Sequence, residues 1–278
     1  MFAIDEVIRN ALREDIGAGD VTTRVTVDAA TSAQGELLAK EEFLVAGLEV
    51  ARRVFSLVDA EIRFDTGFRD GMAVAAGQVF ALVSGRAVSI LQGERVALNF
   101  LQRLSGIATL TRQFVKAVEG TKASIVDTRK TTPGLRMLEK YAVRVGGGRN
   151  HRFSLADGIL IKENHSRAAG GIAVAVGRAL REAPHPLRVE VEVATLEETA
   201  EALAAGADIL LLDNMTPHQV RQAVELVAGK ALVEVSGGVN LATVRSLAEC
   251  GVDFISVGAL THSSRAMDIS LLFDTSFP

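Results

Sequence analysis

The second half of the chain alternates short apolar runs with helical patterns, and this alternation limits the possible folds more than any other feature. Segments with helical periodicity, such as LEETAEALAAG and HQVRQAVELVAG, separate runs that have the length of strands. Such repeats predict right-handed βαβ units and a parallel sheet. The predicted strands lie at residues 124–128, 158–162, 188–193, 208–213, 231–238 and 253–260.

The number of predicted strands is smaller than the eight of a regular (β/α)₈ barrel. Either two strands are hidden in the sequence, or the barrel is smaller and irregular. A doubly wound open sheet is a further alternative. The barrel is favoured because polar residues follow the strands at the positions where barrel enzymes place their functional groups.

The first half of the chain has a different pattern. Strand-like pieces at 36–47, 61–65 and 78–85 surround a helical pattern at 48–58, which is typical of an α+β unit. A long helix predicted from about residue 89 to 118 leads into the second half.

Polar and small residues stand at the carboxyl end of every predicted strand in the second half. In a parallel barrel these ends share one face, here called the mouth, and that face is where βα loops build chemistry. Residues far apart in the sequence are therefore predicted to converge there. They are Asp127–Lys130, Lys162, Glu192, Asp213 with Asn214, Ser236-Gly237-Gly238, and Gly258.

A strongly basic stretch runs from 127 to 153 and reads DTRKTTPGLRMLEKYAVRVGGGRNHRF. Arg136, Lys140 and Arg144 recur every four residues, so they are interpreted as a solvated helix face, with Glu139 also at the surface. The remaining cations stand at strand ends or in the GGGRNH loop, whose glycines allow a ligand to approach the backbone. They are predicted to bind an anion and are Arg129, Lys130, His151, Arg152 and Lys162.

Carboxylates follow the same pattern. Glu190 and Glu192 share one side of a strand, and a buried carboxylate there needs a cation, hydrogen-bond donors or a metal. A functional role is favoured for Glu192 and for Asp213, whereas Glu190 is expected to pair with a core cation. The loops SGGV and VGAL are of the kind that holds a phosphate. The histidines show no metal-ligand spacing, which argues against a structural zinc site.

Composition excludes several partners. The 30 lysines and arginines are outnumbered by 34 aspartates and glutamates, so a nucleic-acid or membrane partner is not expected. A single cysteine, Cys250, fits the reducing cytoplasm, and the start MFAIDEV is too acidic for a secretory signal. No apolar run approaches the roughly 18 residues that span a bilayer. A cytoplasmic location is expected.

The motifs resemble those of the quinolinate phosphoribosyltransferases, also called carboxylating nicotinate-nucleotide pyrophosphorylases. The resemblance rests on DTRKTTPGLRMLEKYAVRVGGGRNHRFSLADGILIKENH, VEVEVATLEE, ILLDNM, EVSGGVN and ISVGALTHS, and on DVTT and ERVALNFLQRLSGIAT in the first half. It implies an α/β fold with an α+β sandwich domain followed by an irregular α/β barrel with fewer than eight parallel strands. The expected domains are 1–115 and 116–261, with a helix in 1–20 and a tail at 262–278 packing across them.

The resemblance also implies a reaction. Enzymes of this family join quinolinate to 5-phosphoribosyl 1-pyrophosphate, release pyrophosphate and carbon dioxide, and form nicotinate mononucleotide for NAD synthesis. Such substrates carry several negative charges, which paired guanidinium groups can grip. A homodimer with shared active sites, or a larger oligomer, is expected, in which Arg95 reaches the mouth of the partner subunit.

The resemblance assigns a role to each site residue. Quinolinate is placed among Arg129, His151, Arg152 and Lys162, with Thr128 and Lys130 nearby. Glu192 and Asp213 face the ribose hydroxyls and Mg²⁺, and Ser236, Gly237, Gly238 and Gly258 face the 5-phosphate. The catalytic set is Lys130, Lys162, Glu192 and Asp213.

Three other readings compete. A sibling protein of the same fold, associated with molybdenum uptake, has a less complete basic motif than RKTTPGLR and GGGRNHR. An aldolase would use Lys130 or Lys162 to form a Schiff base, for which neighbouring arginines are unfavourable. A metabolite sensor without catalysis would not need both acidic residues together with the basic set.

Overall fold

The structure is a computed structural model that describes residues 2–274, and it contains two compact units. Within the described residues, the first unit comprises the chain up to Leu110, Thr132–Gly146 and the chain from Ser264 onward, and the second comprises Thr111–Thr131 and Gly147–Ser263. The domain boundary expected near residue 115 stays a prediction. Part of the expected tail, residues 275–278, lies outside the described residues.

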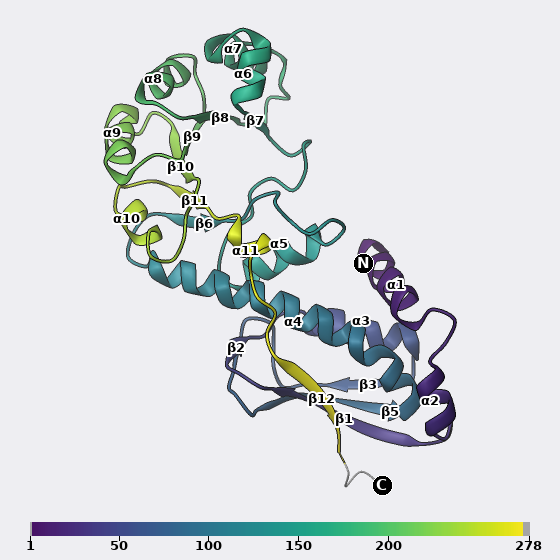
Figure 1. Ribbon diagram of the computed structural model, residues 1–278. Helices are drawn as coiled ribbons and strands as arrows, with labels where there is room; N and C mark the ends of the chain where they lie inside the picture. The colour runs from purple at the N-terminus through teal and green to yellow at the C-terminus, as the bar shows by residue number, and fades with distance from the viewer. Residues whose placement is uncertain (1, 275–278) are drawn as a thin grey trace. The chain divides into compact units, whose positions relative to one another are not determined.

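The first unit is built on an antiparallel sheet with the strand order β12-β1-β5-β3 (Figure 1). The strands are β1 (Ser32–Ala39), β3 (Arg63–Asp65), β5 (Val79–Arg86) and β12 (Ile269–Phe273), while β2 (Phe43–Leu44) pairs with β4 (Ala73–Val74). The helices are α1 (Phe2–Ile16), α2 (Val21–Thr26), α3 (Leu48–Val58), the start of α4 (Ala87–Ala117) and α5 (Arg136–Val145). The α+β prediction is confirmed, including α3 and the long helix α4, but strand β12 was missed.

Helix α5 corrects one reading of the basic stretch. Glu139 and Lys140 were expected at the surface, yet both side chains are fully buried. Glu139 accepts hydrogen bonds from the Arg103 guanidinium at 2.8 Å and from the Thr132 backbone N–H at 3.1 Å. The buried face of the helix includes Leu138, Ala142 and Val143, so the two charged residues lie beside the apolar stripe and not opposite it.

The second unit contains one parallel sheet, and all six predicted strands are present. The strands are β6 (Ser124–Val126), β7 (Ile159–Ile161), β8 (Val189–Val193), β9 (Ile209–Asp213), β10 (Leu232–Ser236) and β11 (Phe254–Ser256). Their order is β6-β11-β10-β9-β8-β7, and among the described residues no pairing joins β6 to β7. The expectation of an irregular barrel with fewer than eight strands is confirmed, in an open form.

Helices connect successive strands and lie on the outer side of the curved sheet (Figure 1). They are α6 (Glu163–Ala169), α7 (Ile172–Glu182), α8 (Leu196–Ala204), α9 (Pro217–Val227) and α10 (Val244–Ala248), while the short helix α11 (Ala259–His262) follows β11. Apolar residues of the strands, such as Val191, Leu210 and Val235, are buried, while polar residues stand where strands end. In the part of the chain that the structure describes, no helix is long and apolar enough to cross a membrane.

Candidate active site

Lys162 and Glu192 meet at the mouth of the second unit. Lys162 directly follows β7, and its ammonium forms an ion pair with the Glu192 carboxylate near the end of β8. The Lys162 side chain is half exposed, whereas that of Glu192 is 18% exposed. The Lys162 backbone N–H donates to Nδ1 of His165 at 2.9 Å, which fixes the start of α6. His165 thus has a partner, which the sequence did not reveal.

Asp213, at the end of β9, is held by two neighbours. The Ser236 hydroxyl donates to its Oδ1 at 3.0 Å, and the Asn214 amide donates to its Oδ2 at 2.8 Å. A Cβ placed on Gly237 would lie 2.2 Å from Oδ1 of Asn214, and Gly237 has φ = +94°. Only glycine therefore fits at 237 without displacing Asn214.

Lys130 lies beside Gly258. A Cβ on Gly258 would be 3.2 Å from the Lys130 side chain, and the Thr261 hydroxyl donates to the Lys130 carbonyl at 2.7 Å. The Lys130 backbone N–H donates to the Thr128 hydroxyl at 3.0 Å. The loop after β6 is thereby attached to the loop after β11, as the order of these neighbouring strands requires.

Asp127 brings the GGGRNHR loop to the end of β6. Its side chain is fully buried and accepts from the His151 backbone N–H at 2.9 Å and from the Asn150 amide at 2.5 Å. Val126 and Arg149 form an isolated parallel bridge just before this point. The loop between α5 and β7 therefore contributes side chains to the interior of the sheet.

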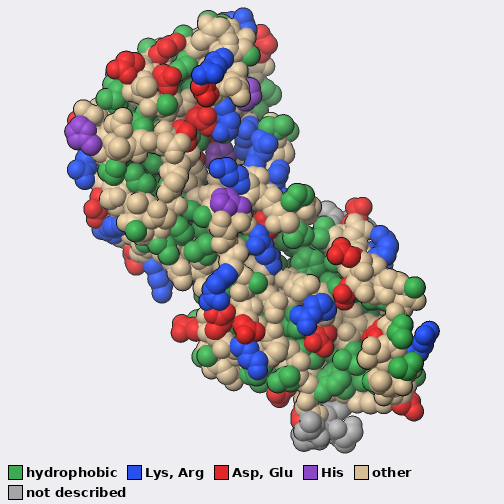
Figure 2. Space-filling view, viewed as in Figure 1, with side chains coloured by type: hydrophobic (Ala, Val, Ile, Leu, Met, Phe, Trp, Pro, Cys, Tyr) green, Lys and Arg blue, Asp and Glu red, His purple; other side chains and the backbone are tan. Residues whose placement is uncertain are grey.

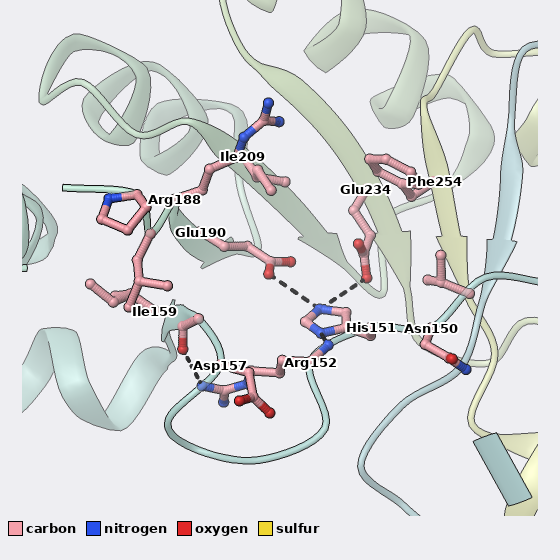
Figure 3. A pocket seen from close by; sticks show the side chains of 14 residues that line it. Asn150, His151, Arg152, Asp157, Ile159, Arg188, Glu190, Ile209, Glu234 and Phe254 are labelled. Atoms are coloured by element: carbon pink, nitrogen blue, oxygen red, sulfur yellow. Dashed lines mark hydrogen bonds and ion pairs between the residues drawn. The ribbon is translucent and has the colours of Figure 1, made fainter. Parts of the chain in front are cut away.

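His151 points at two buried carboxylates (Figure 3). Its Nε2 lies 3.2 Å from Oε2 of Glu190 on β8 and 3.7 Å from Oε1 of Glu234 on β10. These glutamates are only 5% and 4% exposed, and one oxygen of each, Oε1, has no hydrogen-bond partner within the described residues. Burial, followed by the charge of Glu190, raises the pKa of Glu234 to about 7.

Arg152 follows His151 and turns toward the same interior. Its Nη1 donates to the Gly158 carbonyl at 2.9 Å. Burial, followed by the nearby charge of Arg129, lowers the pKa of the Arg152 guanidinium. Arg152 and Arg129 therefore bring positive charge to the same region of the second unit, where Glu190 and Asp157 partly offset it.

A pocket of about 370 Å³ extends from His151 and Arg152 into the sheet interior. Most of its other lining residues stand at or before the beginnings of strands, so the pocket lies toward the amino ends of the sheet and not at the mouth. Its lining includes Asn150, Gly158, Ile159, Arg188, Glu190, Ile209, Glu234 and Phe254. Figure 2 shows lysine and arginine side chains crowded around a hollow in the face of the second unit.

Most of the predicted site residues fall into groups. Lys162 joins Glu192, Asp213 joins Ser236 and Gly237, Lys130 joins Thr128 and Gly258, and His151 joins Arg152 and Arg129. At Gly238, φ is +62° and no atom lies within 4 Å of a Cβ position. Arg95 lies in the first unit, exposed on α4, and within the described residues no ion pair joins it to Glu94.

Sequence reasoning missed two site residues. Glu234 was overlooked, although it stands two residues before Ser236 and so shares its side of β10. Asn150 was noted only as part of a loop, whereas Asp127, which holds it, was predicted at the end of its strand. Glu190 was expected to pair with a core cation, and its partner is the imidazole of His151.

Family models cover both units. The C-terminal domain of quinolinate phosphoribosyl transferase matches residues 107–272, and the N-terminal domain matches residues 20–105. A probable carboxylating nicotinate-nucleotide pyrophosphorylase of Bacillus subtilis is 44% identical over 96% of this chain and 92% of its own length. A chloroplastic carboxylating nicotinate-nucleotide pyrophosphorylase of Arabidopsis thaliana is 44% identical over 99% of this chain and 84% of its own.

Solved structures agree with these matches. NadC from Streptococcus pyogenes superposes with a TM-score of 0.94 at 45% identity, covering 98% of both chains. The nicotinate-nucleotide pyrophosphorylase from Francisella tularensis also gives 0.94, at 41% identity, covering 98% of this chain and 96% of its own.

Proposed function

Because the chain belongs to the quinolinate phosphoribosyl transferase family, we propose that its mouth residues bind the two substrates of that reaction in separate groups. The enzyme transfers phosphoribosyl from 5-phosphoribosyl 1-pyrophosphate to quinolinate with decarboxylation, and forms nicotinate mononucleotide, pyrophosphate and CO₂. This reaction serves NAD synthesis.

Quinolinate binds, in this proposal, beside the paired arginines. Burial, followed by the charge of Arg129, lowers the pKa of Arg152, and Arg152 lines the pocket together with His151. Lys162 adds an ammonium whose side chain is half exposed and forms an ion pair with Glu192. A pyridine with two carboxylates matches this concentration of positive charge. Thr128, Lys130 and His151 complete this side of the mouth.

The phosphoribosyl substrate binds, in this proposal, at the adjoining strand ends. Glu192 and Asp213 face the ribose hydroxyls, and Ser236, Gly237, Gly238 and Gly258 face the 5-phosphate. Gly237 and Gly238 both have positive φ, and a backbone of this kind directs N–H groups toward an anion. This arrangement supports the proposed assignment. The transfer requires that the substrates be positioned and their charges stabilised, so the protein need not supply a base or a nucleophile.

The chemistry follows from these positions. The quinolinate nitrogen forms a bond to the ribosyl carbon as the bond from that carbon to pyrophosphate breaks. Positive charge develops on the ribosyl group, and a carboxylate such as Glu192 or Asp213 stabilises it more than the ground state. The ring nitrogen then carries the positive charge and stabilises the electron pair left on C2 when the 2-carboxyl departs as CO₂, and C2 takes up a proton from water to give the product.

Mg²⁺ is part of the proposal. This ion prefers oxygen ligands and commonly uses one or two protein carboxylates together with substrate phosphates. Glu192 and Asp213 supply such oxygens at adjacent strand ends, so the donor set fits. Bound there, the ion would neutralise charge on the pyrophosphate that leaves.

A homodimer, or a larger oligomer, with shared sites also belongs to the proposal, with Arg95 acting on the mouth of the partner subunit. Its support is the exposed position of Arg95 on α4 together with the family membership. A cytoplasmic location remains a prediction, since a relative from Arabidopsis thaliana is named as chloroplastic. The aldolase alternative is disfavoured, because Lys162 is half exposed and paired with a carboxylate instead of lying in an apolar pocket.

The observation that carries the substrate assignment is the placement of three cations on the second unit: Arg129 follows β6, Lys162 follows β7, and Arg152 lines the pocket beside His151. The test is pyrophosphate release with quinolinate, nicotinate and nicotinamide as alternative acceptors. Quinolinate should be used and the other two should not, because the missing second carboxylate leaves buried positive charge unpaired at a cost of a few kcal/mol. Equal turnover of nicotinate would contradict the assignment.

A further inference from the structure

The inner triad, formed by His151, Glu190 and Glu234, lies below the mouth in the sheet interior (Figure 3). Both glutamates are almost fully buried, and within the described part of the chain the imidazole of His151 lies within ion-pair distance of each. Buried carboxylates are costly unless they are compensated, so this arrangement requires an explanation.

The two ring nitrogens of His151 have different hydrogen-bond partners. The backbone N–H of Arg152 donates to Nδ1 at 2.7 Å, so Nδ1 carries a lone pair and the ring proton resides on Nε2. Nε2–H then faces Oε2 of Glu190 at 3.2 Å.

A metal ion is the competing explanation, because the three ligand atoms lie within 4.8 Å of one another. A histidine bound to a metal through Nε2 must offer a lone pair there, and it usually donates a hydrogen bond from Nδ1. Here Nδ1 accepts a hydrogen bond. This contact at Nδ1 does not fit a metal ion bound at Nε2.

We propose that Glu190 and Glu234 are positioning residues that act on Arg152 through His151. Glu190 accepts Nε2–H and fixes the ring, and the ring in turn accepts the Arg152 backbone N–H. Glu234 faces the same nitrogen from β10, with Glu190 and Asp127 as the other nearby acids. The chain of contacts fixes the Arg152 backbone and so sets where its guanidinium lies in the pocket, beside the Gly158 carbonyl. This inference rests on the proposed role of Arg152 in binding quinolinate.

The test combines two measurements. In the substrate-free protein, ¹⁵N NMR of labelled histidine should show His151 as the Nε2–H tautomer, with its signals assigned by their loss in His151→Asn. In Glu190→Leu, which removes the acceptor without leaving a large cavity, the KM for quinolinate should rise about tenfold, as expected for loss of one hydrogen bond in a buried network. The KM for 5-phosphoribosyl 1-pyrophosphate should not change.

Controls separate positioning from general structure. Glu190→Gln keeps an acceptor and should recover most of the lost quinolinate affinity, whereas Glu225→Gln makes the same chemical change at an exposed site on α9. An Nδ1–H tautomer, an unchanged quinolinate KM in Glu190→Leu, or stoichiometric Zn²⁺ binding that Glu190→Leu abolishes would overturn the inference. Failure of the wild-type protein to convert quinolinate would instead overturn the proposed function, and the NMR result would not depend on it.

Discussion

The ammonium of Lys162 and the carboxylate of Glu192 form an ion pair across the ends of β7 and β8. Each belongs to a different proposed substrate group, one for quinolinate and the other for the ribose. We expect an anionic substrate that reaches the mouth to compete with Glu192 for the Lys162 ammonium. Until then, the ion pair keeps both side chains in place. The pair therefore links the two halves of the site.

Lys162→Ala should abolish most activity while leaving the fold intact. The ion pair is partly exposed, and such pairs stabilise proteins by about 1 kcal/mol or less, so the free energy of unfolding should change little. Turnover should fall by about a hundredfold or more if the ammonium stabilises charge in the transition state. Steady-state kinetics and urea denaturation measure the two effects.

Lys122→Ala is the matched control. Lys122 is also about half exposed and forms an ion pair, with Asp253 at 3.0 Å, but it precedes β6 and lies at the opposite end of the strands. Its loss should have the same small effect on stability and none on turnover. Equal loss of activity in both variants would show that Lys162 contributes through the overall charge of the protein and not through a contact with substrate at the mouth.

Gly237→Ala should damage both stability and binding of the phosphoribosyl substrate. The new Cβ would collide with Asn214, which holds Asp213, and the positive φ adds a cost of about 1–2 kcal/mol. Gly229→Ala separates these effects, because Gly229 also has positive φ, +75°, but nothing lies within 4 Å of its Cβ position. A KM for 5-phosphoribosyl 1-pyrophosphate that rises only in Gly237→Ala confirms the close contact. A rise in neither variant contradicts it.

Stability should decrease as the pH rises from about 5 to 8, in part because of Glu234. The pKa of Glu234 is raised from 4.5 to about 7 in the folded protein, so between these values the folded state holds a proton that the unfolded state has released. The stabilising contribution is complete below pH 4.5 and is lost as the pH rises through 7. Its size is on the order of a few kcal/mol.

Glu234→Gln tests this dependence, because the amide mimics the protonated carboxyl at every pH. Urea denaturation across this range should give a flatter profile for Glu234→Gln than for the wild type, whereas Glu225→Gln should follow the wild type. Parallel profiles for the wild type and Glu234→Gln would place the pH dependence elsewhere.

The sequence predicted local periodicity and strand ends better than it predicted burial. The strands β6 to β11 follow from apolar runs, and Lys162, Glu192 and Asp213 could be placed at the mouth because each directly ends such a run. The burial of Glu139 and Lys140 could not be predicted, because it depends on the segments that pack against α5.

Long-range contacts were equally inaccessible. Strand β12 pairs with β1, although more than two hundred residues separate them in the sequence, and no local sequence pattern predicts this pairing. His151 reaches Glu190 and Glu234 through a loop whose path depends on buried Asp127. Periodicity identifies the side of a strand that a residue occupies, but not which loop residue meets it.

Arg95 provides the sharpest test of a shared site. We expect Arg95→Ala and Lys162→Ala each to be inactive alone, because one removes a guanidinium from α4 and the other removes an ammonium from the mouth. In a mixed dimer with shared sites, one site carries both lesions and the other carries neither. Random exchange between equal amounts should therefore restore about a quarter of wild-type activity in a two-fold symmetric dimer.

Glu192→Gln mixed with Lys162→Ala is the matched control for this complementation. Both residues belong to the second unit and form one ion pair, so every site of a mixed dimer keeps one lesion and no recovery is expected. Subunit exchange must be demonstrated in both mixtures by mass labelling. Recovery in the Arg95 mixture alone then means that α4 of one subunit contributes to the mouth of the other. Only if each site takes Arg95 and Lys162 from different subunits can both substitutions fall in one site and leave the second site intact. Exchange without recovery would place Arg95 in the site of its own subunit or outside the chemistry.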